Sequence, residues 1–169
     1  DILILDANLS EFFYFNLFSD VDLVSKIKVC FEGTSPSKVK RILNRNSKGQ
    51  SFLDFVDVFS PNIVELEAVK KSGNVDIERK DLTVLCKEGS AGVFVTSNGE
   101  NIRSKSLIMG KERFHSRGCG DTLAAAFLFS LFFQDTSLPE SLNFASRAAA
   151  ITGRSTYSVA NDYSILNSK

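Results

Sequence analysis

The sequence predicts an α/β fold with a mainly parallel β-sheet. Short apolar runs alternate with longer segments of helical pattern over most of the 169 residues. Continuous apolar runs are typical of parallel strands that are covered on both faces. Strands that alternate with helices predict crossover connections, with helices on both sides of the sheet. We therefore expect a three-layer αβα sandwich.

Five apolar runs are the predicted strands. They are residues 2–5, 28–31, 56–62, 82–86 and 92–97. Pro61 breaks the third run near its end, because proline has no N–H group for the sheet. Residues 97–100 (SNGE) contain the Asn-Gly pair of a tight hairpin turn. The last run should therefore begin an antiparallel pair near one edge of the sheet.

The remaining segments are predicted helices. They are residues 10–28, a segment that begins at Ser35, and residues 63–73, 120–134 and 139–152. Ser35 is a favourable N-cap residue, and Pro36 fits the first helical position. Gly73 is typical of the end of a helix. The sequence contains no internal repeat, so we expect one α/β unit over residues 1–169. The chain begins inside an apolar run, which indicates a piece of a longer domain.

Composition disfavours several classes of protein. The chain has 20 basic and 20 acidic residues and a formal net charge of zero, so no nucleic-acid partner is expected. Residues 123–133 form the longest apolar run, far below the ~20 residues of a membrane span, and no signal peptide is visible. The cysteines Cys30, Cys86 and Cys119 are widely spaced, which indicates reduced thiols and a cytoplasmic protein.

The segment GCGD (residues 118–121) is the strongest candidate for chemistry. Glycines before a helix let the backbone approach an anion, so Gly118, Cys119 and Gly120 could form an anion hole for a phosphoryl group. Asp121 could then accept the proton of an attacking hydroxyl. The alternative is that Asp121 only caps the helix, which is the commoner role of such a turn taken alone.

Two further clusters of residues favour a catalytic site. Asn62 and Glu65 are three residues apart at the start of a helix and therefore share a face. Their oxygens suit a hydrated magnesium ion, although the same pair could form a capping box. In KEGSAG (residues 87–92), Gly89 and Gly92 could bring the backbone against a nucleotide, and a plain turn between strands would have a similar sequence.

The order and spacing of these elements resemble the C-terminal part of ribokinase-like (PfkB family) carbohydrate kinases. That family shares a PN..E segment, a strand followed by G..G, and a GAGD turn that opens a buried helix. This chain has PNIVE (61–65), GSAG (89–92) and GCGD (118–121), and NFASRAAAITG (143–153) is similar to the family's helix beside the adenine. The early DANLS and FEGTSPSKVKRIL most resemble the pseudouridine kinase branch.

The resemblance implies a kinase that uses ATP and Mg²⁺ to phosphorylate a hydroxyl of a sugar or nucleoside, with pseudouridine as the most specific expectation. It implies that Asp121 is the general base and that the amides of Gly118, Cys119 and Gly120 bind phosphoryl oxygens. The implied nucleotide contacts are Lys87, Gly89, Gly92 and Ser146, and the implied magnesium site is Asn62 with Glu65. A homodimer is among the expected assemblies.

Several positions depart from the family pattern. Cys119 replaces the usual alanine, a tolerable change because the backbone N–H acts. Arg117 replaces a small residue and could hold phosphate or obstruct the site. Gly33 stands where the pseudouridine kinase branch has proline. Family members also carry an N-terminal half with the sugar-binding segment and a lid, which this sequence lacks.

Two other classes of function are alternatives to a kinase. One is a truncated or degenerate relative without catalysis, with a binding or regulatory role. The other, an NAD-binding oxidoreductase, is disfavoured, because its glycine fingerprint should follow the first strand and DANLS has no glycine.

Overall fold

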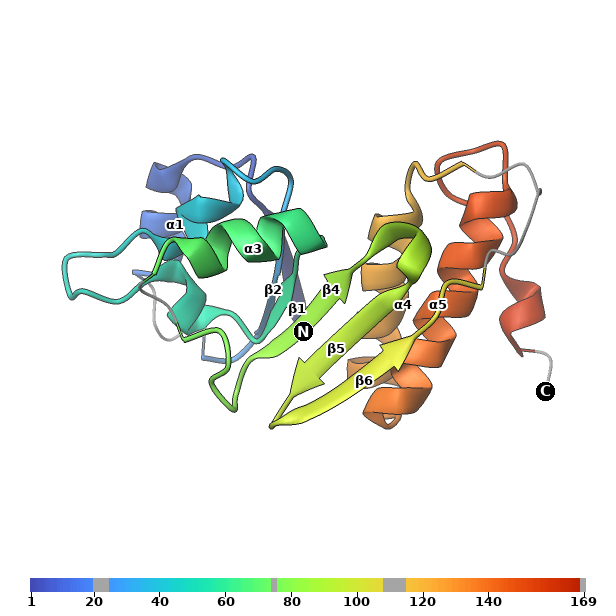
Figure 1. Cartoon of the computed structure of the whole chain (residues 1–169). Coiled ribbons are helices and arrows are strands. Elements are labelled where there is room, and N and C mark those ends of the chain that lie inside the picture. Colours follow the sequence, from blue (N-terminus) through green and yellow to red (C-terminus); the bar gives the residue numbers. More distant parts are fainter. Residues whose placement is uncertain (20–24, 74–75, 108–114, 168–169) are drawn as a thin grey trace. The chain divides into compact units, whose positions relative to one another are not determined.

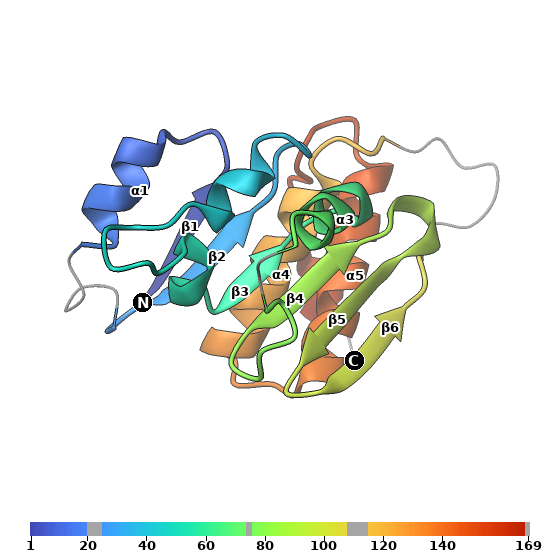
Figure 2. The ribbon, with the colours of Figure 1, turned by 60° about the vertical axis from the view of Figure 1, so that its left-hand side comes forward.

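The computed structural model describes residues 1–19, 25–73, 76–107 and 115–167 (Figure 1). Six strands form one sheet in the order β1-β2-β3-β4-β5-β6. The strands are β1 (Ile2–Asp6), β2 (Lys28–Glu32), β3 (Val58–Ser60), β4 (Thr83–Lys87), β5 (Val93–Ser97) and β6 (Glu100–Ser104). β1 to β4 pair in parallel, and Figure 2 shows β5 running against β4 and β6. The mainly parallel sheet that the sequence predicted is confirmed.

The chain divides into two compact units. The first contains Asp1–Lys87 and Val95–Asn101, and the second contains Glu88–Phe94 and Ile102–Lys169. The helices of the first unit are α1 (Glu11–Leu17) and α3 (Ile63–Lys71), with 3₁₀ turns at Val39–Leu43 and Phe52–Phe55. The second unit contains α4 (Cys119–Phe133) and α5 (Leu138–Arg154), with 3₁₀ turns at Gly89–Ala91 and Ser164–Asn167.

Aromatic side chains form the core of the first unit. The ring of Tyr14, from α1, lies 5.8 Å from that of Phe31 in β2 and 5.3 Å from that of Phe52. All three side chains are fully buried. The hydroxyl of Tyr14 donates a hydrogen bond to the carbonyl oxygen of Asp6, at the end of β1. Burial therefore fixes α1 against the carboxyl ends of the first strands.

Two predicted helices differ from the structure. The helix expected over residues 10–28 begins with Ser10 as its N-cap but ends at Leu17, with Phe18 as its C-cap and the Ser19 hydroxyl donating to the carbonyl of Asn16. Residues 20–24 of that prediction lie outside the described residues. After Ser35, the hydroxyl does accept the N–H of Lys38 at 3.3 Å, but the element that begins there is a 3₁₀ turn and not an α-helix.

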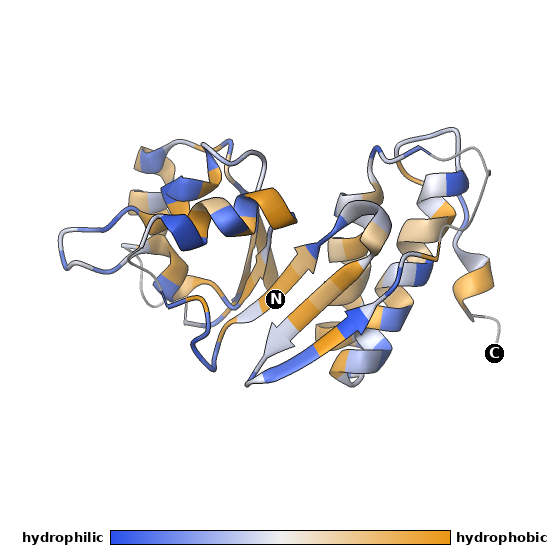
Figure 3. Cartoon of the chain, in the orientation of Figure 1, coloured by the Kyte–Doolittle hydropathy of each residue, from blue (hydrophilic) through white to orange (hydrophobic). Residues whose placement is uncertain are grey.

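The predicted hairpin and the last two helices are confirmed. Asn98 and Gly99 both have positive φ, 52° and 81°, as a tight two-residue hairpin turn requires. Ser137 and Glu140 form a capping box at the start of α5. Many residues of α4 and α5 are apolar and buried, among them Phe127, Leu128, Leu142 and Ala145. Figure 3 shows the apolar β4 and β5 beside the more hydrophilic β6.

Candidate functional site

Polar side chains end the parallel strands of the first unit. Asp6 is the last residue of β1, Glu32 of β2, Ser60 of β3 and Lys87 of β4. Asp6 pairs with Glu32, and Glu32 pairs with Ser60, so the side chains of these three point to one face of the sheet. We call these four residues the polar row. In open parallel sheets, ligands bind at this carboxyl edge.

Asn62 and Glu65 form a capping box at the start of α3. Asn62 Oδ1 accepts the N–H groups of Val64 and Glu65, each at 3.0 Å, and Glu65 Oε2 accepts the N–H of Asn62 at 2.8 Å. The Glu65 side chain packs against Gly33, and the residue is only 2% exposed. The capping interpretation of this pair is thus confirmed. A magnesium role would have to use acceptor positions on these side-chain oxygens that the cap hydrogen bonds do not occupy.

Lys87 is directed toward β2. Its Nζ lies 2.5 Å from the carboxylate of Glu32, and the side chains of the two residues are 16% and 13% exposed. Its backbone N–H donates to the carbonyl of Pro61 at 2.9 Å. Lys87 therefore contacts both the end of β2 and the residue that precedes Asn62.

In the second unit, the GCGD turn opens α4. Gly118 is the N-cap with φ +77°, and a Cβ at this position would lie 1.5 Å from the carbonyl oxygen of Ser158. The Cys119 N–H donates to the carbonyl of Ser116 at 3.3 Å. Within the described part of the chain, the amides of Gly120 and Asp121 have no acceptor. Asp121 is exposed in this first helical turn, so open amides and a carboxylate are adjacent.

Burial raises the pKa of the Cys119 thiol, and the nearby Asp121 carboxylate raises it further. The thiol donates to the carbonyl oxygen of His115 at 3.2 Å. The raised pKa disfavours the thiolate, and the N–H of Cys119 already donates to Ser116, so Cys119 is engaged through both its side chain and its amide.

The GSAG turn has one crowded and one open glycine. A Cβ on Gly92, at φ +113°, would lie 2.1 Å from the carbonyl oxygen of Ser104, whereas Gly89, at φ +60°, has no atom within 4 Å of that position. Ser146 is 7% exposed, and its Oγ lies 3.0 Å from Ser104 Oγ and 2.8 Å from the carbonyl oxygen of Leu142. Gly92 and Ser146 thus pack around the end of β6, and Gly89 leaves its backbone accessible.

The structure divides the expected site residues between the two units. Asn62, Glu65 and Lys87 lie together in the first unit. The GCGD turn, Gly89, Gly92 and Ser146 lie in the second. Sequence reasoning missed Glu32 and Ser60, whose signal was their place at the last position of a strand. Among the described residues, no three His, Cys, Asp or Glu side chains are placed to hold a metal ion.

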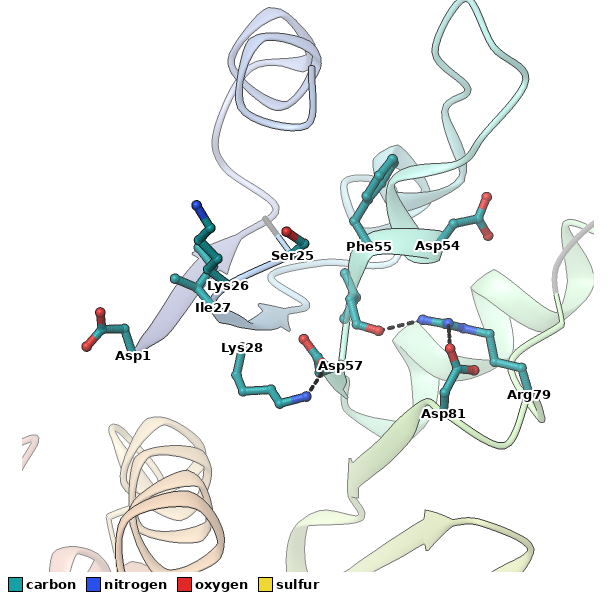
Figure 4. A pocket seen from close by; sticks show the side chains of 11 residues that line it. Asp1, Ser25, Lys26, Ile27, Lys28, Asp54, Phe55, Asp57, Arg79 and Asp81 are labelled. Carbon is teal, nitrogen blue, oxygen red and sulfur yellow. Dashed lines mark hydrogen bonds and ion pairs between the residues drawn. The ribbon is translucent and has the colours of Figure 1, made fainter. Parts of the chain in front are cut away.

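A charged pocket of about 480 Å³ lies at the opposite, amino edge of the parallel strands (Figure 4). Two ion pairs line it: Lys28 Nζ is 2.8 Å from Asp57, and Arg79 is 2.6 Å from Asp81. Arg79 also donates to the carbonyl oxygens of Leu53 and Val56. Arg79 thus connects Asp81 with the backbone that precedes β3.

Comparison with known proteins supports the fold. No protein-family model matches the chain. A ribokinase from Arabidopsis thaliana is 31% identical over 114 residues, which are 59% of this chain and 29% of that protein. A carbohydrate kinase from Agrobacterium tumefaciens superposes with a TM-score of 0.70 at 21% identity, over 96% of this chain and 51% of the other. An adenosine kinase from Sinorhizobium meliloti gives a TM-score of 0.73 at 18% identity, over 95% and 51%.

A third structure, A. thaliana ribokinase complexed with ribose and ATP, gives a TM-score of 0.64 at 22% identity, over 92% of this chain and 50% of the other. The chain therefore has the ribokinase-like α/β fold, as the sequence predicted. It spans about half the length of these solved structures. In the described ranges, no helix combines the length and the apolar character needed to cross a membrane.

Proposed function

We propose that the protein is an ATP-dependent phosphotransferase that acts on a hydroxyl of a sugar or nucleoside. The observation that carries the proposal is the start of α4, where the open amides of Gly120 and Asp121 adjoin the exposed Asp121 carboxylate. A helix N-terminus of this kind stabilises a transferring phosphoryl group, and the carboxylate supplies a base beside it.

In the proposed reaction, the acceptor hydroxyl oxygen attacks the γ-phosphorus of ATP. Asp121 takes the hydroxyl proton as the new oxygen–phosphorus bond forms, and ADP leaves with the electrons of the broken bond. The open amides of Gly120 and Asp121, together with the amide of Gly118, hold the phosphoryl oxygens. Cys119 contributes its backbone dipole, since its N–H already meets Ser116.

Magnesium would neutralise charge on the triphosphate. Asn62 and Glu65 offer oxygen donors, the type that Mg²⁺ prefers. Because Asn62 Oδ1 and Glu65 Oε2 already accept cap hydrogen bonds and Glu65 is nearly buried, the pair fits an ion that keeps its waters. In this proposal the two residues hold water molecules of the hydrated ion and make no direct bond to the metal.

The nucleotide would pass beside the turn at residues 87–92, where Gly89 leaves room for close approach. Ser146 would act by packing behind Ser104, next to the same turn, because its hydroxyl is already engaged. Arg117 is exposed beside GCGD and offers a cation to the phosphates.

Pseudouridine is the proposed acceptor within this class. In support, the two segments that resemble the pseudouridine kinase branch contact each other: Lys38 Nζ donates to Asn8 Oδ1 at 2.7 Å, and Arg41 donates to the carbonyl oxygens of Ala7 and Leu9 at 3.0 Å each. Gly33 counts against it, because a proline there would place its Cβ on the Glu65 carboxylate.

The first test is a calorimetric titration of the chain with ATP, with and without Mg²⁺. We expect saturable binding that depends on magnesium, and equal binding by the Asp121→Asn variant. Phosphoryl transfer to pseudouridine, adenosine and ribose is then compared for the two forms, and turnover should fall at least about 100-fold in Asp121→Asn. Equal turnover by the wild-type chain and Asp121→Asn would contradict the role of Asp121 as the general base.

A non-catalytic relative is the second candidate. The engagement of the Lys87 and Ser146 side chains in internal contacts favours it, since neither is free for a nucleotide. A folded chain that binds no ATP in the same titration would support this candidate over the kinase.

A further inference from the structure

We propose that the Glu32–Lys87 ion pair positions the Asn62–Glu65 cap, and that Lys87 serves the nucleotide site through this pair and not as a direct phosphate ligand. The part of the inference that concerns nucleotide rests on the proposed function. The part that concerns the cap stands on the contacts of the first unit.

The ion pair joins β2 to β4 across one intervening strand. Glu32 ends β2 and Lys87 ends β4, so the two residues lie two strands apart, about 10 Å at the usual strand spacing. Both side chains must extend toward each other across β3, where Ser60 is the register partner of Glu32 and is fully buried. With both charged groups mostly buried, the attraction is only weakly screened.

Each end of the ion pair is one step from the cap. On one side, the Lys87 N–H holds the carbonyl of Pro61, which immediately precedes Asn62. On the other side, Glu32 is followed by Gly33, which lies against the Glu65 carboxylate. The ion pair therefore closes a ring of contacts around the start of α3. Loss of either charge should loosen both sides of the cap.

The same contacts disfavour a direct phosphate role for Lys87. To reach a phosphate, the ammonium group would have to leave Glu32, whose largely buried carboxylate would then lose its cation. Removing one partner from a buried pair is strongly unfavourable. A positioning role keeps the pair intact while nucleotide binds.

Hydrogen exchange of the Asn62 amide tests the cap directly, because this N–H donates to Glu65 Oε2. We expect exchange about tenfold faster in Glu32→Gln and in Lys87→Met, with protection restored in Lys87→Arg, which keeps the charge. Lys28→Met is the matched control, since it removes the Lys28–Asp57 pair at the other edge of the sheet. Lys28→Met should leave the exchange rate of the Asn62 amide unchanged. Unchanged Asn62 exchange in both Glu32→Gln and Lys87→Met would overturn the proposal.

Nucleotide affinity separates the two roles of Lys87. If Lys87 acts by positioning the cap, Glu32→Gln and Lys87→Met should each weaken MgATP binding severalfold. The double variant should then bind MgATP no more weakly than the single variant with the lower affinity. If Lys87 is a direct phosphate ligand, Glu32→Gln should instead strengthen MgATP binding, because the ammonium group would be released from Glu32 and could bind phosphate. Tighter binding by Glu32→Gln would contradict the inference. If the wild-type chain binds no MgATP, the proposed function fails, and the exchange experiment still decides the cap.

Discussion

The carboxylate of Glu65 occupies the space that a side chain at Gly33 would need. An ideal Cβ on Gly33 would lie 2.2 Å from Glu65 Oε2 and 2.8 Å from Glu65 Cδ. The same carboxylate caps α3 through the N–H of Asn62. Gly33 is therefore required by a neighbour that is distant in sequence.

Gly33→Ala should destabilise the protein by about 1–3 kcal/mol, because the methyl group forces the Glu65 carboxylate away from its cap. Urea unfolding measures the cost. In a Glu65→Ala background the same change should cost much less, since the clashing atoms are gone. An equal cost in both backgrounds would show that Glu65 is not the cause.

Gly49 and Gly118 form a matched pair for a second prediction. Their φ angles are +78° and +77°, but a Cβ on Gly49 meets nothing within 4 Å, whereas one on Gly118 meets the Ser158 carbonyl oxygen. Gly49→Ala should cost about 1–2 kcal/mol, the strain of the left-handed conformation. Gly118→Ala should cost at least about 2 kcal/mol more in urea unfolding. Similar costs would mean that the Ser158 contact is easily relieved.

Alkylation of Cys119 should report the charge of Asp121. Burial and the Asp121 carboxylate both raise the pKa of this thiol, so little thiolate exists at neutral pH. Asp121→Asn removes one of the two causes, lowers the pKa and should accelerate iodoacetamide labelling severalfold at pH 7.5, as followed by mass spectrometry. Cys30 and Cys86 are buried and should stay unlabelled in the folded chain. An unchanged labelling rate would show that the charge of Asp121 does not affect the pKa of the Cys119 thiol.

Ionisation of Tyr14 should weaken the fold at high pH. Burial, with the Asp6 carboxylate, raises the pKa of its hydroxyl from 10.0 to about 12. The unfolded chain therefore loses this proton first, so the contribution is complete below pH 10 and is lost as pH rises toward 12. Tyr14→Phe should be less stable near pH 8, because the Asp6 carbonyl loses its donor, and should show a smaller loss between pH 10 and 12 in urea unfolding. A parallel decline in both proteins would assign the pH effect to other groups.

Five of the six strands were predictable because each is a short apolar run bounded by turn residues. β6 has no such run, and only the Asn98-Gly99 turn, with its two positive φ angles, indicated a strand there. The helix ends were harder to predict. The pattern of residues 10–28 continues past Leu17, and α1 ends where the backbone and hydroxyl of Ser19 bond the carbonyls of its last turn. After Ser35, side-chain bonds from Lys38 and Arg41 to the β1 loop accompany a 3₁₀ turn instead of a regular helix.

The candidate site was predictable where it depends on neighbours in sequence. The Asn62–Glu65 cap and the GCGD turn at the start of α4 are local patterns, and the structure has both. Glu32 could not be matched to Lys87, because 55 positions separate them and only the parallel register brings their strands together. The burial of Ser146 likewise depends on Ser104 in another element.

The clasp of Lys38 and Arg41 on the loop after β1 has a consequence for how this sequence can diverge. Lys38 contacts a side chain, that of Asn8, so substitutions at these two positions should occur together in related proteins. Arg41 donates to the backbone carbonyls of Ala7 and Leu9, so this contact constrains the arginine and not the side chains of its two partners, although burial restricts Ala7 to a small residue. A lysine there would offer a point charge in place of the planar fork that spans both carbonyls. In related proteins, we therefore expect Arg41 and the backbone path of the loop to vary less than the identities of the loop residues.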